Sequence, residues 1–348
     1  MLFSWDSQAA HKLVCIEKYP ETHDTFSFRF ADHGETQVFD FKPGQFINLG
    51  VEIDGRVEYR SYSLSSLPFD DYIQVTIKRV KNGRVSNFLI DHLLVGDEVE
   101  VYAPMGNFNY ADNCLRVTER GKQHVLLISA GCGAAPVFAM AKALLLHDEN
   151  IDVTYLHIAR TAQDIIYAKE LLALEQCYHN LHLKFLLKDA TGTSHAQGRL
   201  NQQWLTALAP HLNESNVYLC GPSQFMSDVK CYLEAEDFDM NYFFYESFTP
   251  QITSNESDSP ALYDVTVLPQ GRAYSAGKGE LLADVLQREG LPIIIACRSG
   301  ICGSCRCKVT SGNLVRHPDH VLSNQEKEDG FVLACCAEID SAVSVDIA

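Results

Sequence analysis

Apolar and polar residues alternate over short segments in the first hundred positions of the chain. Phe26, Phe28 and Phe30 follow a period of two, and a proline-glycine turn at 43–44 separates further apolar segments. A period of two places successive apolar side chains on one face of a β-strand. Because no long helical period interrupts these segments before about Ser86, the pattern predicts a small antiparallel β-barrel.

From residue 125 onward the pattern changes to an apolar strand, a glycine turn and a helix, with further strands along the chain. Strands are expected at residues 125–128, 153–158, 183–187, 217–220 and 242–245. Such alternation predicts a parallel sheet covered by helices, with a nucleotide site at the carboxyl ends of its strands. The segment 125–141 approaches the length of a membrane span, but glycines and a proline interrupt it. We therefore expect a buried strand, a turn and a helix there.

A third pattern begins after residue 250. Residues 251–260 are rich in Ser, Asn, Asp and Pro and lack hydrophobic periodicity, which predicts a flexible linker. Alternation resumes at 263–267, and one clear helix is expected from about Gly279, ended by Gly290 and Pro292. These features predict a separate small domain.

The composition is that of an ordinary globular protein. The length of 348 residues suffices for several domains, and 46% of the residues are hydrophobic. A net charge of −17 without a dense basic segment argues against nucleic acid as a partner, because Lys and Arg bind phosphate backbones. Residues 1–10 show no positive segment ahead of an apolar stretch, so we expect no secretory signal and a cytoplasmic protein.

Half of the 12 cysteines crowd into residues 297–336, which favours a metal centre over a disulfide framework. Cys297, Cys302 and Cys305 have the spacing C-x4-C-x2-C, and Cys335 follows thirty residues after Cys305. This is the spacing of plant-type 2Fe-2S clusters, whose iron and sulfide need soft thiolate ligands. A structural zinc site is the alternative, but zinc sites usually offer two short cysteine pairs.

Two further cysteines lie near this motif. Cys336 adjoins Cys335 and competes with it as the fourth ligand, but the thirty-residue interval favours Cys335. Cys307 is expected to be a strand residue. Residues 296–305 together with Cys335 resemble a plant-type ferredoxin domain extending over 263–348. This resemblance implies a 2Fe-2S cluster held by Cys297, Cys302, Cys305 and Cys335.

Arg60, Tyr62 and Ser63 form the pattern R-x-Y-S, which resembles the flavin motif of the ferredoxin-NADP reductase superfamily over roughly the first 250 residues. The resemblance implies that Arg60 binds the FAD pyrophosphate, that Tyr62 stacks on the isoalloxazine, and that Ser63 hydrogen-bonds near flavin N5. A guanidinium is a bidentate phosphate ligand, which suits the first role. Residues 83–86 resemble the second flavin-phosphate element, where N–H groups at a helix start face the anion.

Nicotinamide motifs follow in the second region. Gly131, Gly133 and Pro136 give the form G-x-G-x-x-P that this superfamily shows between a buried strand and a helix. Residues 220–222, with the sequence C-G-P, resemble the element whose cysteine lies beside the nicotinamide ring. The segment around Glu246 resembles the element that ends the nicotinamide domain near the flavin.

Arg160 follows the strand expected at 153–158, so it is placed to lie beside the adenosine ribose of a nicotinamide cofactor. A cation there can hold a 2'-phosphate or stack on adenine, and Arg160 alone does not decide between NADPH and NADH. The branch of the superfamily that the chain resembles uses NADH. We therefore expect NADH, with NADPH as the alternative.

Together these motifs predict a multidomain chain. We expect a flavin-binding antiparallel β-barrel at 1–115, a Rossmann-like α/β domain for NAD(P)H at 116–250, a linker at 251–262 and a β-grasp, ferredoxin-like α+β domain at 263–348. The resemblance implies catalytic roles for Ser63, Cys220 and Glu246. It implies cofactor binding by Arg60, Tyr62, Ser63, Lys78, Gly83, Val85, Ser86, Gly131, Gly133, Pro136, Arg160, Gly221 and Pro222.

This domain order predicts an enzyme that carries electrons from NADH to FAD, to the cluster and out to a partner protein. FAD is needed because a nicotinamide gives two electrons as a hydride, whereas the cluster takes one. Over its whole length the chain resembles the NADH oxidoreductases that serve the hybrid cluster protein, which implies that partner. Reductases of Rieske-type or other multicomponent oxygenases share this layout and are the alternative. A non-catalytic redox sensor is a further hypothesis, but no DNA-binding or signalling segment supports it.

Overall fold

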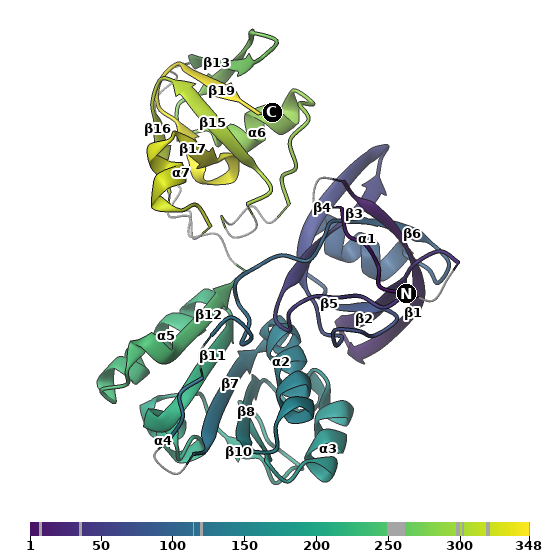
Figure 1. Cartoon of the computed structure of the whole chain (residues 1–348), viewed down its shortest axis with the longest axis vertical. Helices are drawn as coiled ribbons and strands as arrows, with labels where there is room; N and C mark the ends of the chain where they lie inside the picture. The colour runs from purple at the N-terminus through teal and green to yellow at the C-terminus, as the bar shows by residue number, and fades with distance from the viewer. Residues whose placement is uncertain are drawn as a thin grey trace. The chain divides into compact units, whose positions relative to one another are not determined.

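The computed structural model describes residues 1–6, 9–34, 37–113, 115–118, 121–248, 262–296, 300, 303–317 and 321–347 (Figure 1). The chain forms two compact units, Met1–Val57 with Tyr62–Ser247 and Glu58–Ser61 with Phe248–Ala348. The first unit therefore combines most of the two N-terminal domains that the sequence predicts. The linker expected at 251–262 lies outside the described residues, except for Leu262.

An antiparallel six-stranded sheet forms the N-terminal region, in the order β4-β3-β6-β1-β2-β5. Its strands are β1 (His11–Thr22), β2 (Thr25–Ala31), β3 (Phe46–Ile53), β4 (Arg56–Ser63), β5 (Ile73–Lys78) and β6 (Glu98–Val101), and helix α1 (Arg84–His92) lies between β5 and β6 in the chain. An antiparallel bridge joins Leu64, just after β4, to Val75 on β5. The two outer strands of the sheet order are thereby linked, as a barrel requires.

The predicted alternation explains how this sheet buries its core. Phe28 and Phe30 of β2 are fully buried, and their rings stack with centroids 6.4 Å apart. Phe26 packs against the same core from a partly buried position. Residues two apart on a strand share one face, so the three rings reach one hydrophobic core, and the antiparallel-sheet prediction is confirmed.

A parallel six-stranded sheet follows in the order β10-β9-β8-β7-β11-β12. Its strands are β7 (Gln123–Ala130), β8 (Ile151–Ala159), β9 (Leu181–Leu187), β10 (Ala196–Gln197), β11 (Ser215–Gly221) and β12 (Phe243–Ser247). The α-helices are α2 (Ala134–His147), α3 (Ala168–Cys177), α4 (Gln202–Leu208) and α5 (Ser223–Ala235), with short 3-10 turns η1 (Gly131–Gly133), η2 (Ala162–Asp164), η3 (Leu212–Glu214) and η4 (Met240–Tyr242). The strand expected at 242–245 begins one residue later, because Tyr242 belongs to η4.

Helices cover both faces of the parallel sheet (Figure 1). Val125 and Leu127 of β7 pack in the cluster that contains α2 and α3 residues. Leu126 and Ile128 pack in the cluster that contains α4 and α5 residues. Alternate side chains therefore enter two cores, which explains the continuous apolar run of this strand. Residues 125–141 form a strand, a turn and a helix as predicted, and none of the described helices is long and apolar enough to cross a membrane.

The second unit contains a five-stranded sheet, β14-β13-β19-β15-β17, and a two-stranded sheet, β16-β18. The strands are β13 (Leu262–Leu268), β14 (Arg272–Gly277), β15 (Arg306–Ser311), β16 (Leu314–Arg316), β17 (Phe331–Leu333), β18 (Ala337–Ile339) and β19 (Val343–Asp346). Helices α6 (Leu282–Arg288) and α7 (Asn324–Glu328) and the turn η5 (Ala334–Cys336) complete the unit.

The helix expected from Gly279 begins three residues later, at Leu282. Gly279 N–H donates to Ile339 O at 2.7 Å, and Ile339 N–H donates to Glu280 O at 2.9 Å. An antiparallel bridge also pairs Leu281 with Glu338. These strand-like hydrogen bonds to β18 hold the preceding residues extended, so the helix starts only after them.

Candidate active site

Three residues predicted to be catalytic meet where β11 and β12 end. Cys220 and Glu246 are directly paired in the parallel ladder of these strands. Ser63, at the end of β4, donates a hydrogen bond from Oγ to Glu246 Oε2 at 3.4 Å, although 183 residues separate them. All three side chains are buried. The fold therefore brings together residues that the sequence alone left far apart.

Burial keeps this cluster uncharged at neutral pH. It raises the pKa of Glu246 to about 8, against the opposing effect of the hydrogen bond from Ser63. Burial also raises the pKa of the Cys220 thiol well above its usual range, and the neighbouring Glu246 adds to that effect. Both groups therefore carry their protons, and the site offers a neutral carboxyl group and a neutral thiol.

The turn η1 packs directly against this strand end. A Cβ atom added to Gly133 would lie 2.0 Å from Cys220 O and 2.7 Å from Gly221 N, so no other residue fits there. Gly131 has a φ of +56°, and a Cβ at this position would meet nothing within 4 Å. Position 133 therefore needs glycine because there is no room for a side chain, whereas position 131 favours glycine because of its positive φ.

Helix α2 presents its N-terminus next to these glycines. Its first turn contains Pro136 but no acidic residue, and no side chain caps it. The free N–H groups and the helix dipole of such a terminus suit an anion. Pro222 precedes α5, and a Cβ at Gly221 would lie 2.8 Å from Phe225 Cδ1. The residues of this edge therefore fit a nicotinamide dinucleotide with its pyrophosphate at α2.

A second helix N-terminus occurs in the flavin-binding region. Helix α1 follows Gly83, with no capping side chain and no acidic residue in its first turn. A Cβ at Gly83 would lie 2.6 Å from Ser86 Oγ, so the turn is closely packed. The Val85 side chain is buried in the barrel core, which leaves only its backbone for a ligand. This arrangement fits the phosphates of FAD.

The remaining residues predicted to bind cofactors have varied surroundings. Arg60, on β4, donates from Nη1 to Tyr59 O at 2.7 Å, and Tyr62 packs partly buried against the barrel core. Lys78 pairs with Asp24, with Nζ and Oδ1 2.9 Å apart. The charge of Lys78 is thus already partly compensated by a carboxylate.

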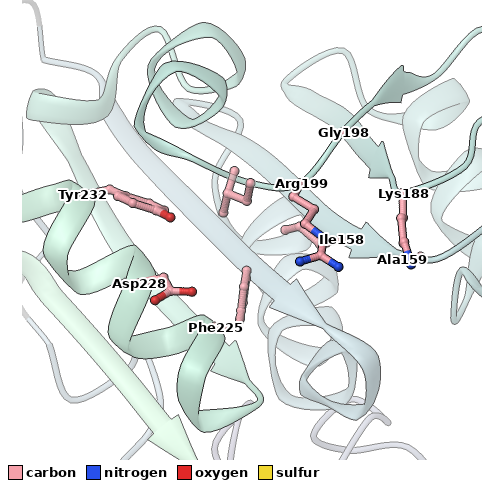
Figure 2. A pocket seen from close by; sticks show the side chains of 9 residues that line it. Ile158, Ala159, Lys188, Gly198, Arg199, Phe225, Asp228 and Tyr232 are labelled. Atoms are coloured by element: carbon pink, nitrogen blue, oxygen red, sulfur yellow. The ribbon is translucent and has the colours of Figure 1, made fainter.

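A pocket of about 230 Å³ lies at the carboxyl ends of β8, β9 and β10. Its lining comprises Ile158, Ala159, Lys188, Gly198, Arg199, Leu200, Phe225, Asp228 and Tyr232. In Figure 2 the side chains of α5 line one side, and Arg199 extends from the other. Arg160, the predicted adenosine residue, follows β8 but is not part of this lining. Sequence reasoning missed Lys188, although it directly follows an expected strand, and Arg199, which follows a strand of only two residues.

The cysteine motif is partly described. Cys305 and Cys335 are both buried, and Cys335 N–H donates to Cys305 Sγ at 3.5 Å. The Sγ atoms of Cys335 and Cys336 are 3.8 Å apart, whereas Cys307 lies in β15 opposite Val332. Cys297 and Cys302 lie outside the described residues. Adjacent buried sulfur donors with a backbone N–H donor fit the chemistry of an iron-sulfur cluster.

Comparisons with known protein families match three parts of the chain. Residues 12–110 match the oxidoreductase FAD-binding domain, 127–231 the oxidoreductase NAD-binding domain, and 265–340 the 2Fe-2S iron-sulfur cluster binding domain. The chain is 33% identical to the glycine betaine monooxygenase reductase subunit of Pseudomonas aeruginosa, over 97% of this chain and 95% of that protein.

Two further similarities extend along most of the chain. The chain is 28% identical to the NADH oxidoreductase HCR of Escherichia coli, over 90% of this chain and 91% of that protein. The solved structure of phthalate dioxygenase reductase shares the fold, with a TM-score of 0.65 and 23% identity over 97% of this chain and 98% of that one. The chain belongs to the NAD(P)H-dependent, FAD-binding ferredoxin reductases that carry a C-terminal 2Fe-2S domain.

Proposed function

We propose that this chain is the reductase component of a multicomponent oxygenase and acts in the cytoplasm. The observation that carries the proposal is the 33% identity to a glycine betaine monooxygenase reductase subunit across nearly the full length of both chains. Similarity to the reductase HCR is lower and covers less of the chain. An oxygenase is therefore better supported as the partner of this chain than the hybrid cluster protein.

In this proposal each part of the chain has a separate task. When bound, FAD would supply the conversion between the two-electron chemistry of NAD(P)H and the one-electron chemistry of a 2Fe-2S cluster. Arg60, Tyr62 and residues 83–86 bind FAD, while Gly131, Gly133 and Pro136 shape the turn and helix start that receive the pyrophosphate of the dinucleotide. Cys297, Cys302, Cys305 and Cys335 hold the cluster.

Ser63, Cys220 and Glu246 have a positioning role at the nicotinamide end. Ser63 Oγ donates a hydrogen bond to Glu246 Oε2, which orients the carboxyl group. The buried carboxyl group stays protonated below a pH of about 8. Cys220 packs closely against the Gly133 turn, since a Cβ at Gly133 would lie 2.0 Å from Cys220 O, and this contact sets the surface on which the nicotinamide ring lies.

The hybrid cluster protein is the second candidate partner, because the chain resembles the reductases that serve it and is 28% identical to the NADH oxidoreductase HCR over 90% of this chain. The two candidates are separated by reconstitution. The purified protein, loaded with FAD and iron, is mixed in turn with the oxygenase component of a glycine betaine monooxygenase and with a hybrid cluster protein. We expect NAD(P)H-dependent reduction of the oxygenase component to be the faster. Faster reduction of the hybrid cluster protein would reverse the assignment.

A further inference from the structure

The pocket at the carboxyl edge of the parallel sheet contains two cations without an acidic partner. Lys188 and Arg199 both line it. Among the residues that the structure describes, no carboxylate lies within 4.0 Å of either side-chain nitrogen group. Their positive charge is therefore available to a ligand in the pocket.

Acidic residues outnumber basic ones in this chain, 45 to 28, and many cations elsewhere in it pair with a carboxylate. At the opposite edge of the same sheet, Lys122 Nζ lies 3.1 Å from Asp152 Oδ2. Carboxylates also pair with Lys12, Arg29, Lys42, Lys78, Arg79, Lys278, Arg288 and Arg306. Two unpaired cations in one concave site indicate an anionic ligand.

Backbone hydrogen bonds hold both cations on ordered segments. Lys188 N–H donates to Ala159 O at 3.1 Å, and Gly198 N–H donates to Leu187 O at 2.8 Å. A Cβ at Gly198 would lie 2.7 Å from Trp204 Nε1, so the chain leading to Arg199 packs closely on that indole ring. The sheet and α4 thus fix the points from which the two side chains extend.

Two carboxylates near this edge accept hydrogen bonds from neighbouring residues. Asp189, next to Lys188, accepts from Thr191 N at 3.0 Å and from Thr191 Oγ1 at 2.6 Å through Oδ1. Asp228 Oδ1 accepts from Gln224 Nε2 at 2.8 Å. An acidic residue that binds the ribose 2'-hydroxyl is the usual basis of NADH selectivity, whereas a cation there accommodates a 2'-phosphate.

The position of the pocket suits the adenosine half of the dinucleotide. The nicotinamide site proposed above lies at the end of β11, and the pyrophosphate site lies after β7. The sheet order is β9-β8-β7-β11. Going across the sheet from the nicotinamide site at β11, one therefore passes the pyrophosphate site at β7 and then reaches the pocket at β8 and β9. Neighbouring strands are about 4.8 Å apart, so β9 and β10, which Lys188 and Arg199 follow, lie roughly 14 and 19 Å from β11, a distance that suits an extended dinucleotide.

We infer that this reductase selects NADPH over NADH, with Lys188 and Arg199 binding the 2'-phosphate. The inference rests on the proposed function and replaces the expectation of NADH. Arg199 supplies a planar guanidinium for bidentate contact, and Lys188 supplies a second point charge. Phe225 and Tyr232 of α5 line the same pocket and provide apolar surface for adenine.

Two measurements on the holoenzyme test this inference. Ferricyanide reduction gives kcat/KM for NADPH and NADH, and calorimetry compares binding of adenosine 2',5'-bisphosphate with that of ADP, without turnover. We expect wild type to favour NADPH by about tenfold or more, and to bind the bisphosphate more tightly. In Lys188→Ala and Arg199→Ala the ratio of the two kcat/KM values falls by about tenfold, and the preference for the bisphosphate falls with it.

Lys184→Ala is the matched control, because Lys184 lies exposed on the same strand, β9, outside the pocket lining. Its kcat/KM ratio should equal that of wild type. A wild-type preference for NADH, or a ratio that Lys188→Ala and Arg199→Ala leave unchanged, overturns the inference while the proposed function stands. Failure of both nucleotides to reduce the bound flavin would instead contradict the proposed function.

Discussion

Cys220 in the first unit and Cys305 in the second are both buried thiols beside the end of a strand, but their neighbours differ. Cys220 pairs with Glu246, whose carboxyl group adds to the effect of burial on the thiol pKa. Cys305 Sγ instead accepts a hydrogen bond from the backbone N–H of Cys335. A buried carboxyl group beside a thiol disfavours loss of the thiol proton, whereas an N–H donor stabilises a thiolate. Since both side chains are buried to nearly the same extent, at 0% and 2% exposure, their neighbours distinguish the neutral thiol from the proposed metal ligand.

The largest effect is expected from Cys305→Ser, which removes a proposed cluster ligand. Iron should fall from about two atoms per chain towards none, because the hydroxyl is a poor substitute for a soft thiolate. Transfer to the protein partner should be lost, while ferricyanide reduction by NAD(P)H persists, since ferricyanide accepts electrons directly from flavin. Iron analysis and the two activity assays give the result.

Cys307→Ser is the matched control for that substitution. Cys307 is as buried as Cys305, at 2% exposure each, but lies within β15. The Cys307→Ser variant should retain both iron atoms and should still reduce the protein partner. Loss of iron from Cys307→Ser, or full partner reduction by Cys305→Ser, would remove the distinction between the two cysteine environments.

The next largest effect concerns the environment of Cys220. Gly133→Ala places a methyl group 2.0 Å from Cys220 O, so the turn or the strand end must move. A displacement of about 1 Å at a site of hydride transfer reduces kcat/KM for NAD(P)H by roughly 100-fold. Iron and flavin contents should stay normal, and stopped-flow measurement of flavin reduction records the change.

Gly277→Ala provides the comparison for Gly133→Ala, because a Cβ at Gly277 meets only Glu280 Oε2, at 3.9 Å. Its flavin reduction rate should match wild type. A normal rate for Gly133→Ala would mean that the close contact with Cys220 does not set the geometry of hydride transfer.

A smaller, pH-dependent effect is expected from Glu246→Gln. Burial raises the pKa of Glu246 from the usual 4.5 to about 8, so the folded protein keeps a proton that the unfolded chain releases. Between these values the folded state loses stability as pH rises, by about 1.4 kcal/mol per pH unit from this group. Glutamine does not titrate and therefore removes this contribution.

Thermal release of FAD measures the effect. The midpoint for Glu246→Gln minus that for wild type should increase by roughly 5 °C between pH 6 and pH 7.5. A difference that stays constant over this range, or that decreases, would show that Glu246 is ionised in the folded protein. The neutral environment assigned to Cys220 would then be wrong.

Local pattern was enough to predict the fold class and many of the strands. Apolar periodicity along the chain reflects which side chains face a core, as at Phe28 and Phe30. The contact between Ser63 and Glu246 was not predictable from periodicity, because 183 residues separate them and only the folded chain brings them together. The resemblance to a family named both residues without giving their contact.

Lys188 and Arg199 show a second limit of prediction from the sequence. Arg199 follows β10, which has only two residues and no hydrophobic period of its own. Arg199 is of interest because, among the described residues, no carboxylate lies close to its side chain in the folded protein. The residues next to it in the sequence do not reveal this. The start of α6 at Leu282 was similarly missed, since tertiary hydrogen bonds to Ile339 determine it.

The smallest expected effect comes from Cys336→Ser, which tests which of two adjacent cysteines is the fourth ligand. Cys335 contacts Cys305 through its N–H, and its Sγ lies 3.8 Å from that of Cys336. If Cys335 is the ligand, Cys336→Ser keeps about two iron atoms per chain and its visible spectrum, whereas Cys335→Ser loses both. Equal iron in the two variants would mean that the neighbouring sulfur replaces the missing one. Loss from Cys336→Ser alone would transfer the ligand role to Cys336 and leave Cys335 as a buried thiol like Cys220.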